Sequence, residues 1–226
     1  MITSIEVIKS EKSLEKELLL AKKFDLTLMP KLNFIPIIGS NGCGKSTLLR
    51  CLSNHGRGVY GHQALDISIT RPTDVYRYLN SKDNFKIKAP LDKIRGFDAV
   101  ELADKYYSSK LSEGMGTIHS FMPLLDGILE DTIPKNDDRD ILIILDEFDS
   151  GLSLDNIDIV MNKMIDIVTK RQDIQFIFSF NNPFILNYLS YCDNMLLSMY
   201  NGKPVHITTD SGLFRFYKRK DNTFLL

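Results

Sequence analysis

The sequence predicts an α/β fold with a mostly parallel central sheet flanked by helices. Apolar runs of strand length alternate along the chain with segments whose apolar residues recur at the helical period. A glycine-rich loop at residues 39–44 separates one such run from a helical segment, and another run, at residues 141–145, ends in two acidic residues. This order is typical of open sheets whose parallel strands are joined by crossover helices.

The first part of the chain contains five of the expected strands. They are predicted at residues 2–8, 24–28, 34–38, 64–69 and 75–79. Apolar and polar side chains alternate over residues 24–28, as they do in a half-buried strand. Pro36 lacks the N–H that a strand ladder needs, which leaves the ends of the third strand less well defined. The charged segment 10–23 fits either a helix or a hairpin arm, and residues 45–52 should be a helix.

The second part of the chain alternates helices and strands more regularly. Helical spacing is found over residues 117–129, where one face carries Ile118, Phe121, Leu125 and Ile128. The same spacing recurs over residues 157–168, and residues 97–105 can also be helical. The remaining strands are predicted at residues 141–145 and 174–180, followed by a closing antiparallel hairpin of residues 195–199 and 205–208 around Asn201-Gly202.

Size and charge narrow the class of protein. The chain of 226 residues suits a single domain, 1–226, with a small helical lobe at about 70–130. Its 28 basic and 29 acidic residues give a net charge of -1, so any surface for nucleic acid must be a local patch. The three cysteines show no disulfide or metal-site spacing, which favours a cytoplasmic location. No apolar run is long enough to span a membrane, so we expect no transmembrane segment of the chain's own.

The stretch GSNGCGKST, residues 39–47, fits the phosphate-loop pattern G-x-x-x-x-G-K-[ST]. Glycines let such a loop curl so that backbone N–H groups point at phosphate oxygens, and the following helix adds its positive N-terminal end. Lys45 can reach the β- and γ-phosphates, and the Ser46 hydroxyl can ligate Mg²⁺. The predicted nucleotide-binding residues of the loop are Gly39, Ser40, Asn41, Gly42, Cys43, Gly44, Lys45, Ser46 and Thr47.

Cys43 lies inside this loop. We interpret it as a small, tolerated side chain. The alternative is a reactive thiol whose pKa is lowered by the helix end and by Lys45. In that case alkylation of Cys43 should inhibit nucleotide binding, and a Cys43→Ser protein should lose this sensitivity.

Two carboxylates, Asp146 and Glu147, follow the apolar run 141–145 directly. A buried strand thus delivers both acids at its carboxyl end, where ligands of open α/β sheets bind. Because side chains alternate along a strand, we expect the two acids to point in different directions. Asp146 can support Mg²⁺ directly or through a water, and Glu147 can activate a water for attack on a γ-phosphate.

Further motifs resemble those of ABC-type ATPases. The segment LSEGMG, residues 111–116, resembles their signature motif, and residues 149–153 resemble their D-loop. The run LDEFDSGLS, residues 145–153, is similar to that of compact stand-alone "AAA-type" ABC ATPases, relatives of the SMC and recombination-repair heads. Residues 179–186, SFNNPFIL, resemble the switch segment of these proteins. The resemblance spans roughly residues 24–200.

The resemblance implies a head-to-tail homodimer that encloses two ATP molecules. Ser112 and Gly114 of one subunit would face the γ-phosphate held by the other, at the N-terminal end of a helix. It further implies catalytic roles for Glu147, Lys45 and Asn181. Asn181 stands where the family has a histidine. Because an amide cannot become cationic, we expect this difference to affect the rate of ATP hydrolysis and not the binding of ATP.

Some of the family's features have only approximate counterparts. Phe148 stands in place of the usual proline and Ser153 in place of the D-loop aspartate. Gln63 fits poorly by position as the residue that senses Mg²⁺, and the segment 78–84 is its substitute. Phe24 is a candidate for stacking on adenine, although a core position suits it better.

Three functions remain open at this stage. The short interval between the phosphate loop and the signature motif has no room for a long coiled coil, and it is short for a transporter ATPase. We therefore expect an ATP-hydrolysing dimer that acts on an unidentified protein partner in a DNA-related or defence-like process. Basic residues at 82–95 and 214–220 could contact DNA or RNA, although a solvated face is the favoured interpretation of both. The alternation over 214–220 also suits an edge strand whose lysines block aggregation. The alternatives are an ABC transporter ATPase and an ATP-binding dimer with little hydrolysis.

Overall fold

A computed structural model describes residues 1–7, 21–54, 65–71, 73–80, 118, 122–123, 125–130 and 139–207. Its main sheet has the strand order β5-β6-β7-β3-β8-β9, in which every pairing is parallel except that of β8 with β9. In chain order these strands are β3 (Phe34–Ile38), β5 (Thr73–Asn80), β6 (Asp140–Asp146), β7 (Ile174–Ser179), β8 (Met195–Ser198) and β9 (Pro204–His206). The predicted α/β fold with a mostly parallel sheet is confirmed.

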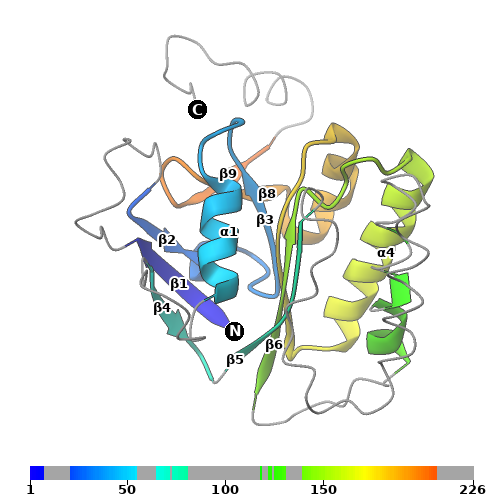
Figure 1. The fold of residues 1–226 in the computed structure, drawn as a ribbon, viewed down its shortest axis with the longest axis horizontal. Coiled ribbons are helices and arrows are strands. Elements are labelled where there is room, and N and C mark those ends of the chain that lie inside the picture. The colour runs from blue at the N-terminus through cyan, green and yellow to red at the C-terminus, as the bar shows by residue number, and fades with distance from the viewer. Residues whose placement is uncertain are drawn as a thin grey trace.

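A second, antiparallel sheet has the order β2-β1-β4. Its strands are β1 (Ile2–Val7), β2 (Lys23–Asp25) and β4 (Leu65–Ile69). This sheet and the main sheet lie on opposite sides of helix α1 (Lys45–Asn54), as Figure 1 shows. One apolar cluster joins all three layers, since it contains Ile5 of β1, Leu49 of α1 and Ile144 of β6. This cluster supports α1, the helix that follows the glycine-rich loop.

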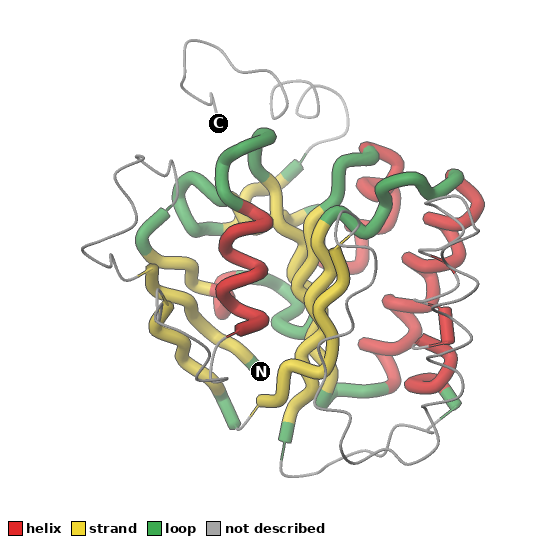
Figure 2. The backbone as a smooth tube through the Cα atoms, in the orientation of Figure 1, coloured by secondary structure: helices red, strands yellow, loops and turns green. Residues whose placement is uncertain are grey.

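The opposite face of the main sheet is covered by helices (Figure 2). They are α4 (Leu154–Lys170), the 3-10 helix η2 (Pro183–Cys192) and a helical segment of which residues 118, 122–123 and 125–129 are described. Leu125 and Ile128 of this segment are buried, in agreement with the helix predicted over 117–129. Phe121 of the predicted face is outside the described residues.

Strand β6 is buried on both faces. Ile141, Ile143 and Leu145 belong to the cluster under α4, and Leu142 and Ile144 belong to the cluster under α1. A strand with two covered faces has no polar positions to alternate with, which explains the uninterrupted apolar run in the sequence. The run therefore ends only where β6 reaches the edge of the sheet, at Asp146.

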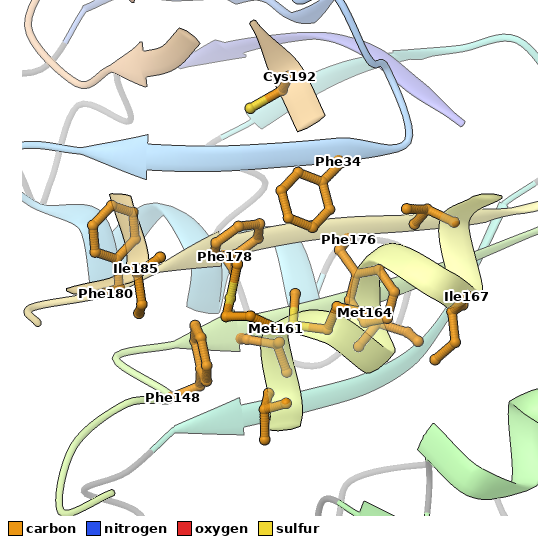
Figure 3. Packing of buried hydrophobic residues seen from close by; sticks show 14 of the residues in the cluster. Phe34, Phe148, Met161, Met164, Ile167, Phe176, Phe178, Phe180, Ile185 and Cys192 are labelled. Carbon is orange, nitrogen blue, oxygen red and sulfur yellow. The ribbon is translucent and has the colours of Figure 1, made fainter. Parts of the chain in front are cut away.

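Aromatic rings pack on the face of the main sheet that α4 covers. Ring contacts run from Phe34 through Phe178 to Phe148, with centroid separations of 4.9 and 5.9 Å (Figure 3). Met161 and Met164 of α4 are fully buried in the same cluster. These contacts anchor Phe148, and with it the turn that follows β6, to the core.

Pro36 is accommodated by its place in β3. The carbonyl of Asn33 accepts from Phe176 on the β7 side, and the carbonyl of Ile38 accepts from Met199 on the β8 side. Because successive residues of a strand face alternate neighbours, the nitrogen of Pro36 faces β8, whose pairing with β3 covers only Ile37 and Ile38. The missing N–H therefore falls one residue before the paired stretch of β3 and β8 begins.

The prediction of a strand over residues 24–28 is wrong for its second half. Strand β2 ends at Asp25, and Leu26–Leu28 form the 3-10 helix η1. The Asp25 carboxylate accepts a hydrogen bond from the N–H of Thr27 (3.1 Å), which turns the backbone out of the strand direction. The alternation of apolar residues has a different origin, since Leu26 is buried and Leu28 is 51% exposed. Phe24 is a fully buried core residue, and the suggestion that it stacks on adenine is wrong.

The predicted closing hairpin is confirmed by the antiparallel pairing of β8 with β9. Gly202 in its turn has φ +67, and a Cβ there would lie 1.9 Å from the carbonyl oxygen of Lys23. The turn also packs on β2, because the N–H of Asp25 donates to the carbonyl of Gly202 (3.2 Å). Glycine is therefore required both by the backbone conformation and by the close approach of the small sheet.

Several predictions fall on residues outside those described. They concern most of segment 10–23, the helix at 97–105, the basic segments 82–95 and 214–220, Gln63, and the signature-like residues 111–116. The small lobe at 70–130 also stays a prediction, although β5, within that stretch, is part of the main sheet. Among the described helices, none is long and apolar enough to cross a membrane.

Candidate functional site

The glycine-rich loop connects the end of β3 to the start of α1. Gly42 and Gly44 have φ values of 79 and 103, in the left-handed region that glycine adopts without strain. The N–H of Cys43 donates to the carbonyl of Ser40 (3.1 Å), which closes the loop on itself. The free N–H groups at the start of a helix attract anions, so the loop and the helix end together form the predicted anion cradle.

Lys45 is the first residue of α1 and is 5% exposed. Its ammonium donates hydrogen bonds to the carbonyl oxygens of Gly39 (2.8 Å) and Ser40 (3.3 Å). Both acceptors are neutral, so they satisfy the donors of the ammonium without cancelling its charge. The positive charge therefore remains inside the loop, where a phosphate group would meet it.

The two predicted metal ligands lie together. The Ser46 hydroxyl, on α1, donates to Oδ1 of Asp146, at the end of β6, over 3.1 Å. Asp146 is fully buried. Mg²⁺ is commonly bound by one or two protein oxygens together with substrate phosphates and water, and this pair suits that role. The described residues contain no group of three or more His, Cys, Asp or Glu that could form an all-protein site.

A third side chain, Ser179 at the end of β7, completes this arrangement. Its hydroxyl donates to the same Oδ1 of Asp146 (2.8 Å) and accepts from the N–H of Glu147 (2.9 Å). Ser179 is fully buried and was not identified as a site residue from the sequence. The signal that could have found it is a single hydroxyl directly after the apolar run 176–178 of a buried strand.

Glu147 does not continue β6. The strand ends at Asp146, and Glu147 has φ 52, a left-handed conformation that is uncommon outside glycine. We expected the two acidic side chains to diverge because side chains alternate along a strand. That reason is wrong, because the backbone itself turns at Glu147. Such a conformation costs of the order of 1 kcal/mol and persists where neighbouring contacts hold it, and strained residues of this kind cluster at functional sites.

Beyond Glu147, Asp149 connects the turn after β6 with the segment after β7. Its carboxylate accepts from the N–H of Asn181 (2.9 Å to Oδ2 and 3.1 Å to Oδ1) and from the N–H of Asn182. Asp149 is 4% exposed. Burial raises the pKa of this carboxyl above its usual range, and the hydrogen bonds from Asn182 and Asn181 oppose the shift. The predicted D-loop and switch segments are thus in direct contact.

Tyr200 reaches the glycine-rich loop from the turn after β8. Its hydroxyl accepts from the N–H of Ser40 (2.7 Å) and is hydrogen-bonded to the Ser40 hydroxyl (2.6 Å). Burial raises the pKa of the Tyr200 phenol above its usual range. The sequence showed no feature that would have identified this contact. It ties the start of the loop to the hairpin that packs on the small sheet.

Cys43 is buried, with 2% of its surface exposed. A Cβ atom added at Gly39 would lie only 2.5 Å from the Cys43 sulfur and 3.0 Å from the Cβ of Met199. The side chain therefore fills the space between the loop and β8. This agrees with the interpretation of Cys43 as a small packing residue, because a thiol without access to solvent reacts poorly with an alkylating reagent.

The predicted residues collect at one edge of the sheet. The loop 39–47 follows β3, Asp146 is the last residue of β6, and Asn181 lies just after β7. These three strands are neighbours in the order β6-β7-β3. Ser153 has a structural role that the sequence did not indicate, since it is the N-cap of α4. Ser112 and Gly114 lie outside the described residues, so their place at the site stays a prediction.

Comparison with known proteins supports the fold. No protein-family model matches the chain, and no curated protein matches its sequence. A metal-chelate type ABC transporter, solved in an inward-facing conformation, matches at 22% identity over 94% of this chain and 87% of its own, with a TM-score of 0.50. An ATP-binding cassette of an ABC transporter matches at 17% identity over 91% of this chain and 90% of its own, with a TM-score of 0.53. The chain therefore has the fold of an ABC-type ATP-binding cassette.

Proposed function

We propose that this protein binds ATP together with Mg²⁺ and hydrolyses the ATP to ADP and phosphate. The observation that carries the proposal is the contact between Ser46 and Asp146, 3.1 Å long, beside the loop that holds Lys45. A hydroxyl at a helix start and a carboxylate at a strand end are brought together from positions 100 residues apart in the chain. A buried carboxylate is costly in an apolar core, whereas a magnesium–phosphate site makes use of one.

Each part of the site has a task in binding. The N–H groups of the loop and the Lys45 ammonium would bind the phosphate oxygens, and Ser46 and Asp146 would hold Mg²⁺. When bound, Mg²⁺ neutralises charge on the phosphates. Ser179 keeps Asp146 oriented, because its hydroxyl donates to the carboxylate from the neighbouring strand.

Hydrolysis requires a water that attacks the γ-phosphorus while the bond to the β–γ bridging oxygen breaks. Glu147, next to the metal pair, would orient this water and accept its proton. Asn181 would donate a hydrogen bond to the γ-phosphate or the water, without adding a positive charge. The fold and the acidic pair support hydrolysis over the alternative of a dimer that only binds ATP, and a turnover assay separates these two functions.

We also propose that the protein works as a head-to-tail homodimer. In this arrangement Ser112 and Gly114 of one subunit would complete the ATP site of the other. The proposal is supported by the order of the motifs in the sequence and by the cassette fold. It predicts that ATP holds the two subunits together until hydrolysis releases them.

We propose that the partner of this protein is a membrane protein and not DNA. The two similar structures named above are parts of ABC transporters, which favours the transporter ATPase over the expected DNA-related or defence-like switch. The comparisons give no support for DNA or RNA contact, and the basic segments that suggested it are outside the described residues. Co-purification with a membrane protein would support this partner, whereas salt-sensitive binding to a DNA duplex would favour the other.

The test of hydrolysis and dimerisation uses Glu147→Gln. This variant should bind ATP with an affinity close to that of the wild type, release little phosphate, and elute as a dimer in gel filtration with ATP and Mg²⁺. Glu130→Gln makes the same chemical change at an exposed position and should behave as the wild type. A Glu147→Gln protein that binds ATP but stays monomeric would contradict the dimer, and unchanged phosphate release would contradict the role of Glu147.

A further inference from the structure

The segments after β6 and β7 stay side by side beyond the ends of the strands. The backbone pairing of β6 with β7 ends at Leu145 and Phe178. Side chains continue it, since Ser179 contacts Asp146 and Glu147, and Asp149 then contacts Asn181 and Asn182. Two side chains therefore extend the ladder from the metal pair to the switch segment.

The turn that carries Asp149 is well anchored. The N–H of Ser150 donates to the carbonyl of Glu147, and the N–H of Leu152 donates to the carbonyl of Asp149, both over 3.1 Å. Phe148 and Leu152 are buried in the core cluster under α4. The Asp149 carboxylate is thus held in place relative to Glu147 by its own turn.

A helix cap does not explain the Asp149 contact. Helix η2 begins at Pro183 and has its own N-cap, because the side chain of Asn182 accepts from the N–H of Phe184 (3.0 Å). Asp149 instead binds the N–H groups of Asn181 and Asn182, in front of the helix. Its carboxylate is almost fully buried, an unfavourable place for a negative charge, and the hydrogen bonds to the segment help to compensate that cost.

We propose that Asp149 is a positioning residue, which holds the backbone of Asn181 so that Asn181 and Glu147 face the same γ-phosphate. The inference rests on the proposed ATPase function and deepens it. Asp149 itself touches neither nucleotide nor metal in this account. It acts through Asn181, so its loss should affect the reaction and not the binding of ATP.

The kinetic test compares Asp149→Asn with the wild type. The amide keeps the size of the carboxylate but is a weaker acceptor for two N–H groups, so kcat should fall about tenfold while the Kd for ATP stays within about twofold. The matched control is Asp158→Asn, because Asp158 accepts a hydrogen bond from the Tyr188 hydroxyl and so ties α4 to the same helix η2 at a different residue. This control should keep the wild-type kcat.

A double variant separates positioning from general stability. If Asp149 acts through Asn181, Asp149→Asn combined with Asn181→Ala should be no slower than Asn181→Ala alone. If the two effects on kcat multiply, the positioning role is wrong. Asp149→Glu keeps the charge and displaces it by one methylene, so its kcat should lie between those of the wild type and Asp149→Asn. This variant tests the positioning role if Asp149→Asn does not fold.

Hydrogen exchange gives a readout that needs no turnover. In the nucleotide-free protein, the peptide covering residues 179–186 should exchange faster in Asp149→Asn than in the wild type, whereas Asp158→Asn should leave the exchange of Asn181 and Asn182 unchanged. Equal exchange in Asp149→Asn and the wild type overturns the contact. A wild-type protein that releases no phosphate overturns the proposed function and the positioning role with it, whereas wild-type turnover that Asp149→Asn retains overturns the positioning role alone.

Discussion

The glycine-rich loop and the ends of β6 and β7 hold their groups in different ways. The loop is a contiguous stretch whose backbone provides the donors, with glycines at φ 79 and 103. The strand ends consist of residues from two distant segments, and side chains of Ser179 and Asp149 hold them together. The loop is suited to hold phosphate groups, and the strand ends are suited to place the reacting groups. Substitutions in the two regions should therefore change different kinetic constants.

The largest effect is expected in the loop, from Lys45→Ala. This change removes a buried ammonium, and a hydrogen bond to a charged group contributes about 1.5–3 kcal/mol, so ATP binding should weaken by about 100-fold. Isothermal titration calorimetry with ATP and Mg²⁺ measures the Kd directly. Lys170→Ala, at a side chain 63% exposed, is the control and should bind as the wild type. A Kd for Lys45→Ala within about threefold of the wild type would mean that phosphate does not bind in this loop.

A smaller effect, of a different kind, is expected at the strand ends from Ser179→Ala. The change removes a donor from the Asp146 carboxylate and an acceptor from the N–H of Glu147. Partners that orient metal ligands typically contribute about 10–100-fold to activity, so kcat should fall by that factor. The Kd for ATP measured without Mg²⁺ should change little. Ser179→Thr keeps the hydroxyl and should recover part of the activity, and a failure of both variants in equal measure would point to packing instead.

The smallest effect is expected from Tyr200→Phe, which tests the support of the loop from outside. The phenylalanine keeps the ring but loses the hydroxyl that contacts the N–H and the side chain of Ser40. A neutral hydrogen bond contributes about 1 kcal/mol, so the Kd for ATP should rise about fivefold while kcat at saturation is retained. A fall in kcat without a change in Kd would assign Tyr200 to the reaction and remove the distinction between the two regions.

Sequence alone identified the loop and most of the fold for physical reasons. The loop depends on residues adjacent in the chain, and a strand buried on both faces, such as β6, reads as an unbroken apolar run. Helix α4 was visible because one apolar face repeats at the helical period. These features are local, so pattern and composition are enough to find them.

The remaining features depend on contacts between distant segments. Ser179, Asp149 and Tyr200 gain their roles only when β6, β7 and β8 are placed next to the loop, and no spacing in the sequence indicates that. The 3-10 helix at Leu26–Leu28 was missed because the hydrogen bond from the N–H of Thr27 to the Asp25 carboxylate outweighs an alternation that also suits a strand. The two acids after the strand 141–145 were expected to diverge by strand alternation, because the left-handed turn at Glu147 leaves no mark in the sequence.

The most direct test of the account is the release of phosphate from ATP by the purified wild-type protein, measured with and without Mg²⁺ beside Lys45→Ala. The account predicts phosphate release that requires Mg²⁺ and that falls to the background in Lys45→Ala. Phosphate release by the wild type that does not exceed the Lys45→Ala background at saturating ATP and Mg²⁺ would contradict the central claim that this site hydrolyses ATP.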